Sequence, residues 1–93
     1  MSTTQHTVQE MQTTLPPSEV LARAKTFFGT RPSLYAAFLD KEGPGYCTFR
    51  GQGGEEIVIA ASAGESGATR VTGSTYLFDM QISRFFSTLP VAA

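Results

Sequence analysis

The sequence predicts an α+β domain: an N-terminal helix, a four-stranded antiparallel meander sheet and a C-terminal helix, with both helices on one sheet face. Three observations lead to this prediction. Apolar residues recur at helical spacing near both ends, over residues 15–29 and 79–90. Between these segments, short runs rich in strand-forming residues are separated by turns that contain glycine. Short turns make consecutive strands antiparallel neighbours, and two amphipathic helices then cover one face of the sheet.

The chain of 93 residues is long enough for one domain. Its first 14 residues are rich in Thr and Gln and hold only scattered apolar side chains, which cannot bury much surface. We therefore expect residues 1–14 to be a polar, flexible tail. Residues 15–93 are expected to form a single α+β domain.

Residues 15–29 predict the first helix. Pro16 and Pro17 prevent an earlier start, Ser18 can cap the free amides, and Gly29 is a typical end. Its apolar stripe consists of Val20, Leu21, Ala24, Phe27 and Phe28. Residues 31–42 fit either a helix or a strand. We favour a strand, because the turn EGPG and a good strand over residues 45–51 follow at once, so that one hairpin explains both.

The later elements follow the same logic. Two further strands are predicted over residues 55–62 and 69–78, and Gly73 inside the second is expected to mark a bulge. Residues 79–90 predict the last helix, with Asp79 as its cap. The apolar stripe of this helix consists of Ile82, Phe85, Phe86 and Leu89.

Composition disfavours several classes of function. The net charge is −1, Lys occurs only twice and no basic run is present, so general nucleic-acid binding is disfavoured. The N-terminus has neither the basic start nor the apolar core of a signal peptide. The longest nearly apolar run, residues 57–63, is too short to span a bilayer. We therefore expect a cytoplasmic protein without membrane insertion.

Catalytic chemistry is not visible in the sequence. His6 is the only histidine and falls in the expected tail, where a base or metal ligand has no rigid site. Cys47 is the only cysteine, and we interpret it as a buried, unreactive thiol. Glu55 and Glu56 are adjacent on a strand, so they point to opposite faces and are poor partners for a two-carboxylate mechanism; we interpret them as a solvated strand entrance. We expect no enzyme, no metal and no cofactor.

Residues 42–49, EGPGYCTF, resemble the octamer of the RNA-recognition motif, in which aromatic side chains of a central strand stack on bases. The matching positions are Gly43, Gly45, Tyr46 and Phe49. The sequence departs from the motif at Glu42, where the motif has a basic residue, and at Pro44, where it has its first stacking aromatic. RNA binding is what the resemblance implies. The alternative that we favour is the turn and second strand of a hairpin.

Alternation along the strands predicts which side chains share a sheet face. The helix-covered face is expected to carry Phe38, Cys47, Phe49, Ile57, Ile59, Val71 and Leu77. The uncovered face would then carry Tyr35, Tyr46, Arg50, Arg70 and Tyr76. Tyr and Arg dominate many binding interfaces, because they bury a large area and tolerate water. An ordinary amphipathic sheet is the alternative explanation.

The function predicted from these observations is a non-catalytic protein–protein interaction module, or an accessory subunit of a larger assembly. Its partner would be another protein or a second copy of the chain. One alternative is a carrier of a small apolar ligand, since the order helix, strands, terminal helix is similar to a shortened helix-grip protein. The other alternative is the RNA-binding module described above.

Overall fold

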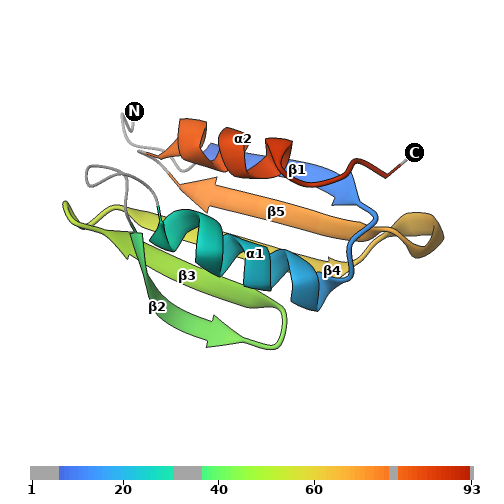
Figure 1. The fold of residues 1–93 in the computed structure, drawn as a ribbon, viewed down its shortest axis with the longest axis horizontal. Coiled ribbons are helices and arrows are strands. Elements are labelled where there is room, and N and C mark those ends of the chain that lie inside the picture. Colours follow the sequence, from blue (N-terminus) through green and yellow to red (C-terminus); the bar gives the residue numbers. More distant parts are fainter. Residues whose placement is uncertain (1–6, 31–36, 76–77, 93) are drawn as a thin grey trace, which may run out of the picture.

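Five antiparallel strands and two α-helices are present in this computed structural model, which describes residues 7–30, 37–75 and 78–92 (Figure 1). The elements are β1 (Thr7–Thr13), α1 (Pro17–Gly29), β2 (Ala37–Gly43), β3 (Tyr46–Gly51), β4 (Glu56–Ala63), β5 (Thr69–Thr75) and α2 (Asp79–Ser87). A short 3₁₀ helix, η1 (Glu65–Gly67), connects β4 to β5. The strand order in the sheet is β1-β5-β4-β3-β2. The α+β class and the antiparallel sheet agree with the sequence prediction.

The prediction of four strands is wrong, because residues 7–13 of the expected tail form a fifth strand. β1 pairs with β5 along its whole length, from Thr7 opposite Thr75 to Thr13 opposite Thr69. The Gln9 side chain of β1 has two hydrogen-bond partners in the last helix. The Gln9 Nε2 donates a hydrogen bond of 2.9 Å to the Asp79 carbonyl, and the Ser83 hydroxyl donates one of 2.9 Å to the Gln9 Oε1. Composition gave no sign of β1, because its partners lie about 70 residues away.

The C-terminal end of the chain also returns to β1. The Thr13 side chain is fully buried and its hydroxyl donates a hydrogen bond of 2.5 Å to the Pro90 carbonyl. The Ala92 amide donates one of 3.0 Å to the Gln12 carbonyl, and Val91 forms an isolated β-bridge with Thr13. β1 is therefore bonded to β5 on one side and to the C-terminal segment at one end of its other side.

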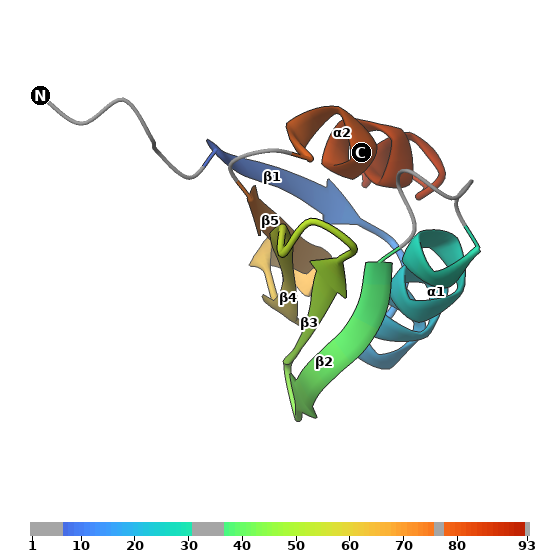
Figure 2. The same ribbon diagram turned by 90° about the vertical axis from the view of Figure 1, so that its left-hand side faces the viewer.

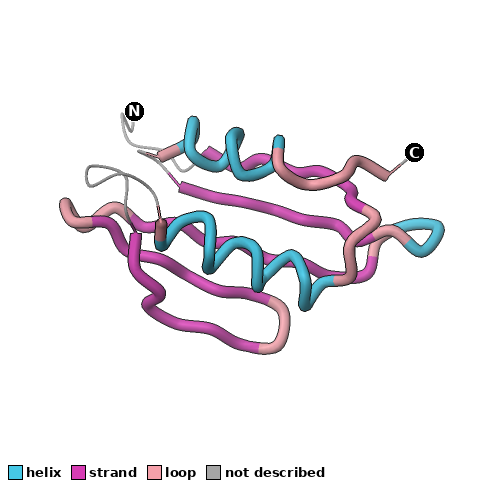
Figure 3. Tube along the Cα trace, viewed as in Figure 1, coloured by secondary structure: helices cyan, strands magenta, loops and turns pink. Residues whose placement is uncertain are grey.

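The remaining strands form the expected meander. β2 and β3 make a hairpin around the turn Pro44–Gly45 (Figure 3), so a strand is the correct interpretation of residues 37–42. Residues 31–36 of the same predicted segment lie outside the described residues. No bulge occurs at Gly73, where the pairing register is continuous with both neighbouring strands. The register shifts instead in β2, between Leu39 and Lys41.

Gly73 has a packing role in place of the predicted bulge. A Cβ atom at this position would lie 2.8 Å from the Cγ2 atom of Ile82 in α2 and 3.3 Å from the Cδ1 atom of Ile59 in β4. Real side chains do not approach so closely, and overpacking of a core is destabilising. The absence of a side chain therefore lets α2 lie directly on β5.

Both helices lie on the same side of the sheet (Figure 2). α1 begins at Pro17, after Pro16, whereas α2 is preceded by Phe78 as its cap residue. The prediction that Asp79 caps α2 is wrong, because Asp79 is the first residue of that helix and places its charge in the first turn. Neither helix in the described part of the chain has the length and apolar character needed to cross a membrane.

Aromatic rings fill the space between the helices and the sheet. Phe28 of α1 has ring-centroid distances of 5.2 Å to Phe49 of β3 and 5.4 Å to Phe85 of α2. All three side chains are almost completely buried. The other buried apolar residues are Val20, Leu21, Ala24, Ala37, Cys47, Ile57, Ile59, Ala61, Val71, Phe78, Ile82 and Leu89. The core thus lies entirely between one face of the sheet and the helices.

Candidate interaction face

The face of the sheet opposite the helices, called the open face below, has no element packed over it in the described structure (Figure 2). Its members follow from strand alternation, because Cys47, Phe49, Ile59 and Val71 are buried on the helix side. The residues of the open face are Val8, Glu10 and Gln12 of β1, Arg70, Thr72 and Ser74 of β5, Glu56, Val58, Ala60 and Ser62 of β4, Tyr46, Thr48 and Arg50 of β3, and Phe38, Asp40 and Lys41 of β2.

Three of the five side chains predicted for the uncovered face lie on the open face. They are Tyr46 and Arg50 of β3 and Arg70 of β5. The other two, Tyr35 and Tyr76, lie outside the described residues, as does Leu77 from the predicted covered face. Val8 and Glu10 also belong to the open face, and the prediction of a tail over residues 1–14 leaves them out.

Phe38 was predicted on the helix-covered face, and this is wrong. Its side chain is 59% exposed, and Phe38 pairs with Arg50 of the open face. A regular ladder counted back from the turn would have put Phe38 opposite Gly51, on the covered face. The bulge before Lys41 adds one residue to β2. The side chains of β2 before the bulge therefore lie on the opposite face from the one that a regular ladder predicts. Ala37 is buried instead.

The middle of the open face is formed by small, uncharged side chains. Val58 and Ala60 of β4 and Thr72 and Ser74 of β5 are all partly buried by their neighbours. Larger apolar side chains stand at the margins, where Val8 is 67%, Phe38 59% and Tyr46 40% exposed. The Tyr46 ring lies over Gly43, its cross-strand partner, at a position that a side chain on Gly43 would occupy. The face therefore combines a low centre with raised apolar margins.

Charged side chains of the open face are arranged as opposite pairs. An Arg70 nitrogen lies 3.0 Å from a Glu10 oxygen, and an Arg50 nitrogen lies 3.5 Å from Asp40 and 3.9 Å from Glu56. The hydrogen bond from Arg70 lowers the pKa of Glu10 below its ordinary value, and Glu10 raises the pKa of Arg70. With Lys41 included, the face carries three positive and three negative side chains. Exposed ion pairs of this kind add little to the stability of the fold.

Cys47 is fully buried on the helix side of β3. Burial raises the pKa of its thiol to about 11, against a smaller opposite influence from Lys25, whose ammonium pairs with Glu42. A thiol with this pKa is protonated at neutral pH, and only the thiolate is a nucleophile.

We therefore expect Cys47 in the native protein to react with a thiol reagent at pH 8 at least about 100-fold more slowly than in the unfolded chain, because burial blocks access as well as ionisation. Absorbance of the released thiol-reagent anion, with and without denaturant, measures both rates. Equal rates would show that Cys47 is accessible in the native state.

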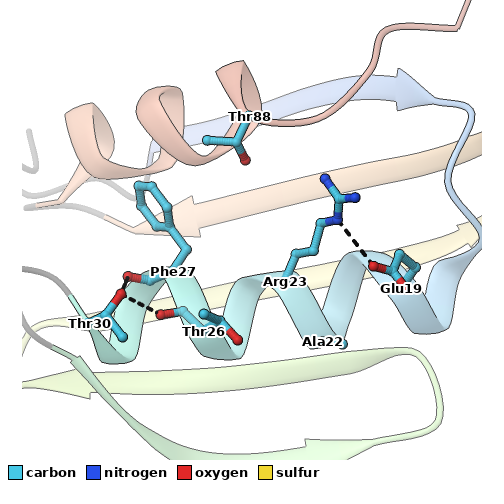
Figure 4. Close-up of a pocket in the computed structure, with 7 residues that line it drawn as sticks. All are labelled: Glu19, Ala22, Arg23, Thr26, Phe27, Thr30 and Thr88. Carbon is cyan, nitrogen blue, oxygen red and sulfur yellow. Dashed lines mark hydrogen bonds and ion pairs between the residues drawn. The ribbon is translucent and has the colours of Figure 1, made fainter.

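A groove lies on the outer side of the helices, away from the open face. It is an open groove of about 500 Å³, lined by Glu19, Ala22, Arg23, Thr26, Phe27 and Thr30 of α1 and by Thr88 after α2 (Figure 4). Arg23 is paired with Glu19 at 3.2 Å. The hydroxyls of Thr30 and Thr88 donate hydrogen bonds to carbonyls of their own helices, so these protons are already used. The groove offers the side of the Phe27 ring and few free polar groups.

Within the part of the chain that the structure describes, no group of three or more His, Cys, Asp or Glu side chains is placed to hold a metal ion. The open face is the candidate functional surface because it groups the exposed side chains of Val8, Phe38 and Tyr46. Comparisons of the sequence with protein-family models and with curated proteins, and of the fold with solved structures, found no match.

Proposed function

We propose that this protein is a non-catalytic interaction module, an accessory subunit of a larger assembly, which docks on another protein chain through the open face. The observation that carries the proposal is the one-sided sheet: the helices cover one face, and the other presents Val8, Phe38 and Tyr46 around an uncharged centre. Exposed apolar and aromatic side chains grouped on one surface are typical of protein interfaces. We further propose a cytoplasmic location, where the single thiol of Cys47 stays reduced.

The charges of the open face favour a protein partner over a nucleic acid. Binding to phosphates requires positive side chains that are free to replace counterions. Here Arg50 and Arg70 are each within 4 Å of a carboxylate of the same face. The equal number of positive and negative side chains also gives no net attraction for a polyanion. RNA binding through Tyr46 is therefore the weaker proposal.

The packing of the core weighs against a ligand carrier of the helix-grip type. Such a carrier needs a cavity between its sheet and its helices. In the described residues, the ring of Phe28 contacts those of Phe49 and Phe85 in that position. The groove of Figure 4 lies on the far side of the helices, away from the sheet. We therefore prefer the interaction module.

The experiment that tests the proposal places a charge at the middle of the open face. Val58→Arg puts a long cationic side chain on central strand β4, and Thr26→Arg puts the same group in the helix groove as a matched control. Tagged versions of the wild type and both variants are used to capture partners from the native host, and the bound proteins are quantified by mass spectrometry. We expect the wild type and Thr26→Arg to capture the same partner chains, and Val58→Arg to lose them by at least about tenfold.

Circular dichroism and thermal unfolding of each variant separate loss of binding from loss of folding. Unchanged capture by a folded Val58→Arg protein would contradict docking through the open face. Loss of capture by Thr26→Arg alone would move the interface to the helix groove.

A further inference from the structure

We infer that the occupant of the open face is a second copy of this chain, so that two sheets pack face to face around a two-fold axis parallel to their strands. This inference rests on the proposed function and names its partner. Four properties of the described residues support it: the edges of the sheet, the shape of the open face, its charges and its area.

The edges of the sheet are poorly suited to pairing with another strand. On edge strand β2, the consecutive charged residues Asp40, Lys41 and Glu42 and the bulge before Lys41 are features that natural sheets use against edge pairing. At the other edge, the outer side of β1 is partly occupied, since Ala92 bonds to Gln12 and Val91 bridges to Thr13. Association is therefore directed to the open face rather than to the edges.

The shape of the open face determines which surfaces meet under this symmetry. Phe38 and Tyr46 stand on β2 and β3, whereas β5 carries the small Thr72 and Ser74. A two-fold axis that runs along central strand β4 places β2 of one copy over β1 of the other, and β3 over β5. Because the Tyr46 ring lies over Gly43 of β2, in the same cross-strand row as Glu10 of β1, the ring then meets Glu10 of the second copy, and β3 itself faces the small side chains of β5.

The charges of the face are compatible with self-association. Glu10 lies on β1 and Lys41 on β2, in adjacent cross-strand rows at opposite sides of the sheet. The same axis brings Glu10 of each copy next to Lys41 of the other, which gives two pairs of opposite charge per dimer. The face carries three positive and three negative side chains, so its net charge in each copy is zero.

The area of the face reaches the lower end of the range for specific interfaces. Five strands about 4.8 Å apart and about seven residues long, at roughly 3.3 Å per residue, give a flat area of about 550 Å². Two such faces together bury about 1,100 Å², before the side-chain relief is counted. Specific interfaces begin at roughly 1,000 Å² of total buried surface, so the open face alone reaches that range.

The test is a charge exchange between copies, followed by light scattering after size-exclusion chromatography. The wild type is expected to elute with twice the 10.0 kDa mass of the chain. Glu10→Lys and Lys41→Glu, each alone, should weaken this dimer at least about tenfold, because each brings two pairs of like charge together. A mixture of the two variants should form a heterodimer, since every contact then joins opposite charges. Glu19→Lys, on the exposed side of α1, is the control and should leave the dimer unchanged.

Recovery of the dimer only in the mixture identifies the Glu10–Lys41 contact. If either substitution acted only by damaging the fold, mixing the two variants would not restore the dimer. A wild-type dimer that neither charge reversal weakens would overturn the inferred arrangement. A wild type that is monomeric up to about 0.5 mM would overturn the second copy as the occupant. Docking through the open face would still be judged by the Val58→Arg capture experiment.

Discussion

The variant Phe28→Ala is expected to lose about 3–5 kcal/mol of the free energy of unfolding, the usual cost of removing a fully buried aromatic ring. Phe28 has no exposed surface, and its ring contacts those of Phe27, Phe49 and Phe85. These contacts join both helices to the sheet, so the cavity left by alanine would lie where three elements meet. A domain of this size has a total stability of roughly 5–15 kcal/mol, and the loss is a large part of it.

Phe38→Ala is the matched control, because it removes the same ring from a side chain that is 59% exposed on the open face. We expect a change of less than about 1 kcal/mol in the free energy of unfolding. Urea denaturation followed by circular dichroism measures both variants. Equal losses for the two would contradict the placement of Phe38 outside the core.

Met11→Pro is expected to destabilise the protein by about 3 kcal/mol, because β1 is a bonded strand of the sheet. The Ala92 amide bonds to the Gln12 carbonyl on the outer side of β1, so the backbone groups of Gln12 point away from β5. Backbone groups alternate in direction along an antiparallel strand, and those of Met11 therefore point towards β5. Proline removes a ladder hydrogen bond there and leaves a carbonyl of β5 without its donor.

Glu10→Pro is the control for this prediction. The amide of Glu10 points outward like that of Gln12, and proline is tolerated at such positions of edge strands. Met11→Ala measures the side-chain part of the Met11→Pro effect separately. Thermal unfolding should then rank Met11→Pro well below the other two variants. If Met11→Pro were as stable as Glu10→Pro, residues 7–13 would not be a strand of the sheet.

Local patterns in the sequence were enough to predict the helices and the meander. The stripe of Ile82, Phe85 and Leu89 and the turn at Pro44 each act within a few residues, and the structure has α2 and the β2–β3 hairpin at these places. β1 was missed because its stabilising partners are distant. Gln9 forms a hydrogen bond with α2 and Thr13 forms one with Pro90, and the composition of residues 1–14 indicates neither contact.

The candidate face was only partly predictable for a related reason. Alternation along β3 and β5 placed Tyr46, Arg50 and Arg70 together, because both strands are regular. Alternation predicts the wrong sheet face for Phe38, because no residue type in β2 indicates the single-residue bulge before Lys41. At Gly73 the sequence predicts a bulge where none occurs, because a glycine inside a strand fits a bulge or a close packing contact equally well. The continuous pairing register of β5 excludes the bulge, and the position of Ile82 shows the packing contact.

The central claim is that the open face is the surface that meets other chains. The most direct measurement replaces one alanine at a time with a photo-crosslinking amino acid in the native host, at Ala60 on the open face or at Ala22 in the helix groove. The claim predicts a crosslinked product from Ala60 and none from Ala22, and the mass of that product shows whether its partner is a second copy of the chain. Crosslinks from Ala22 alone, or from neither position, would contradict it.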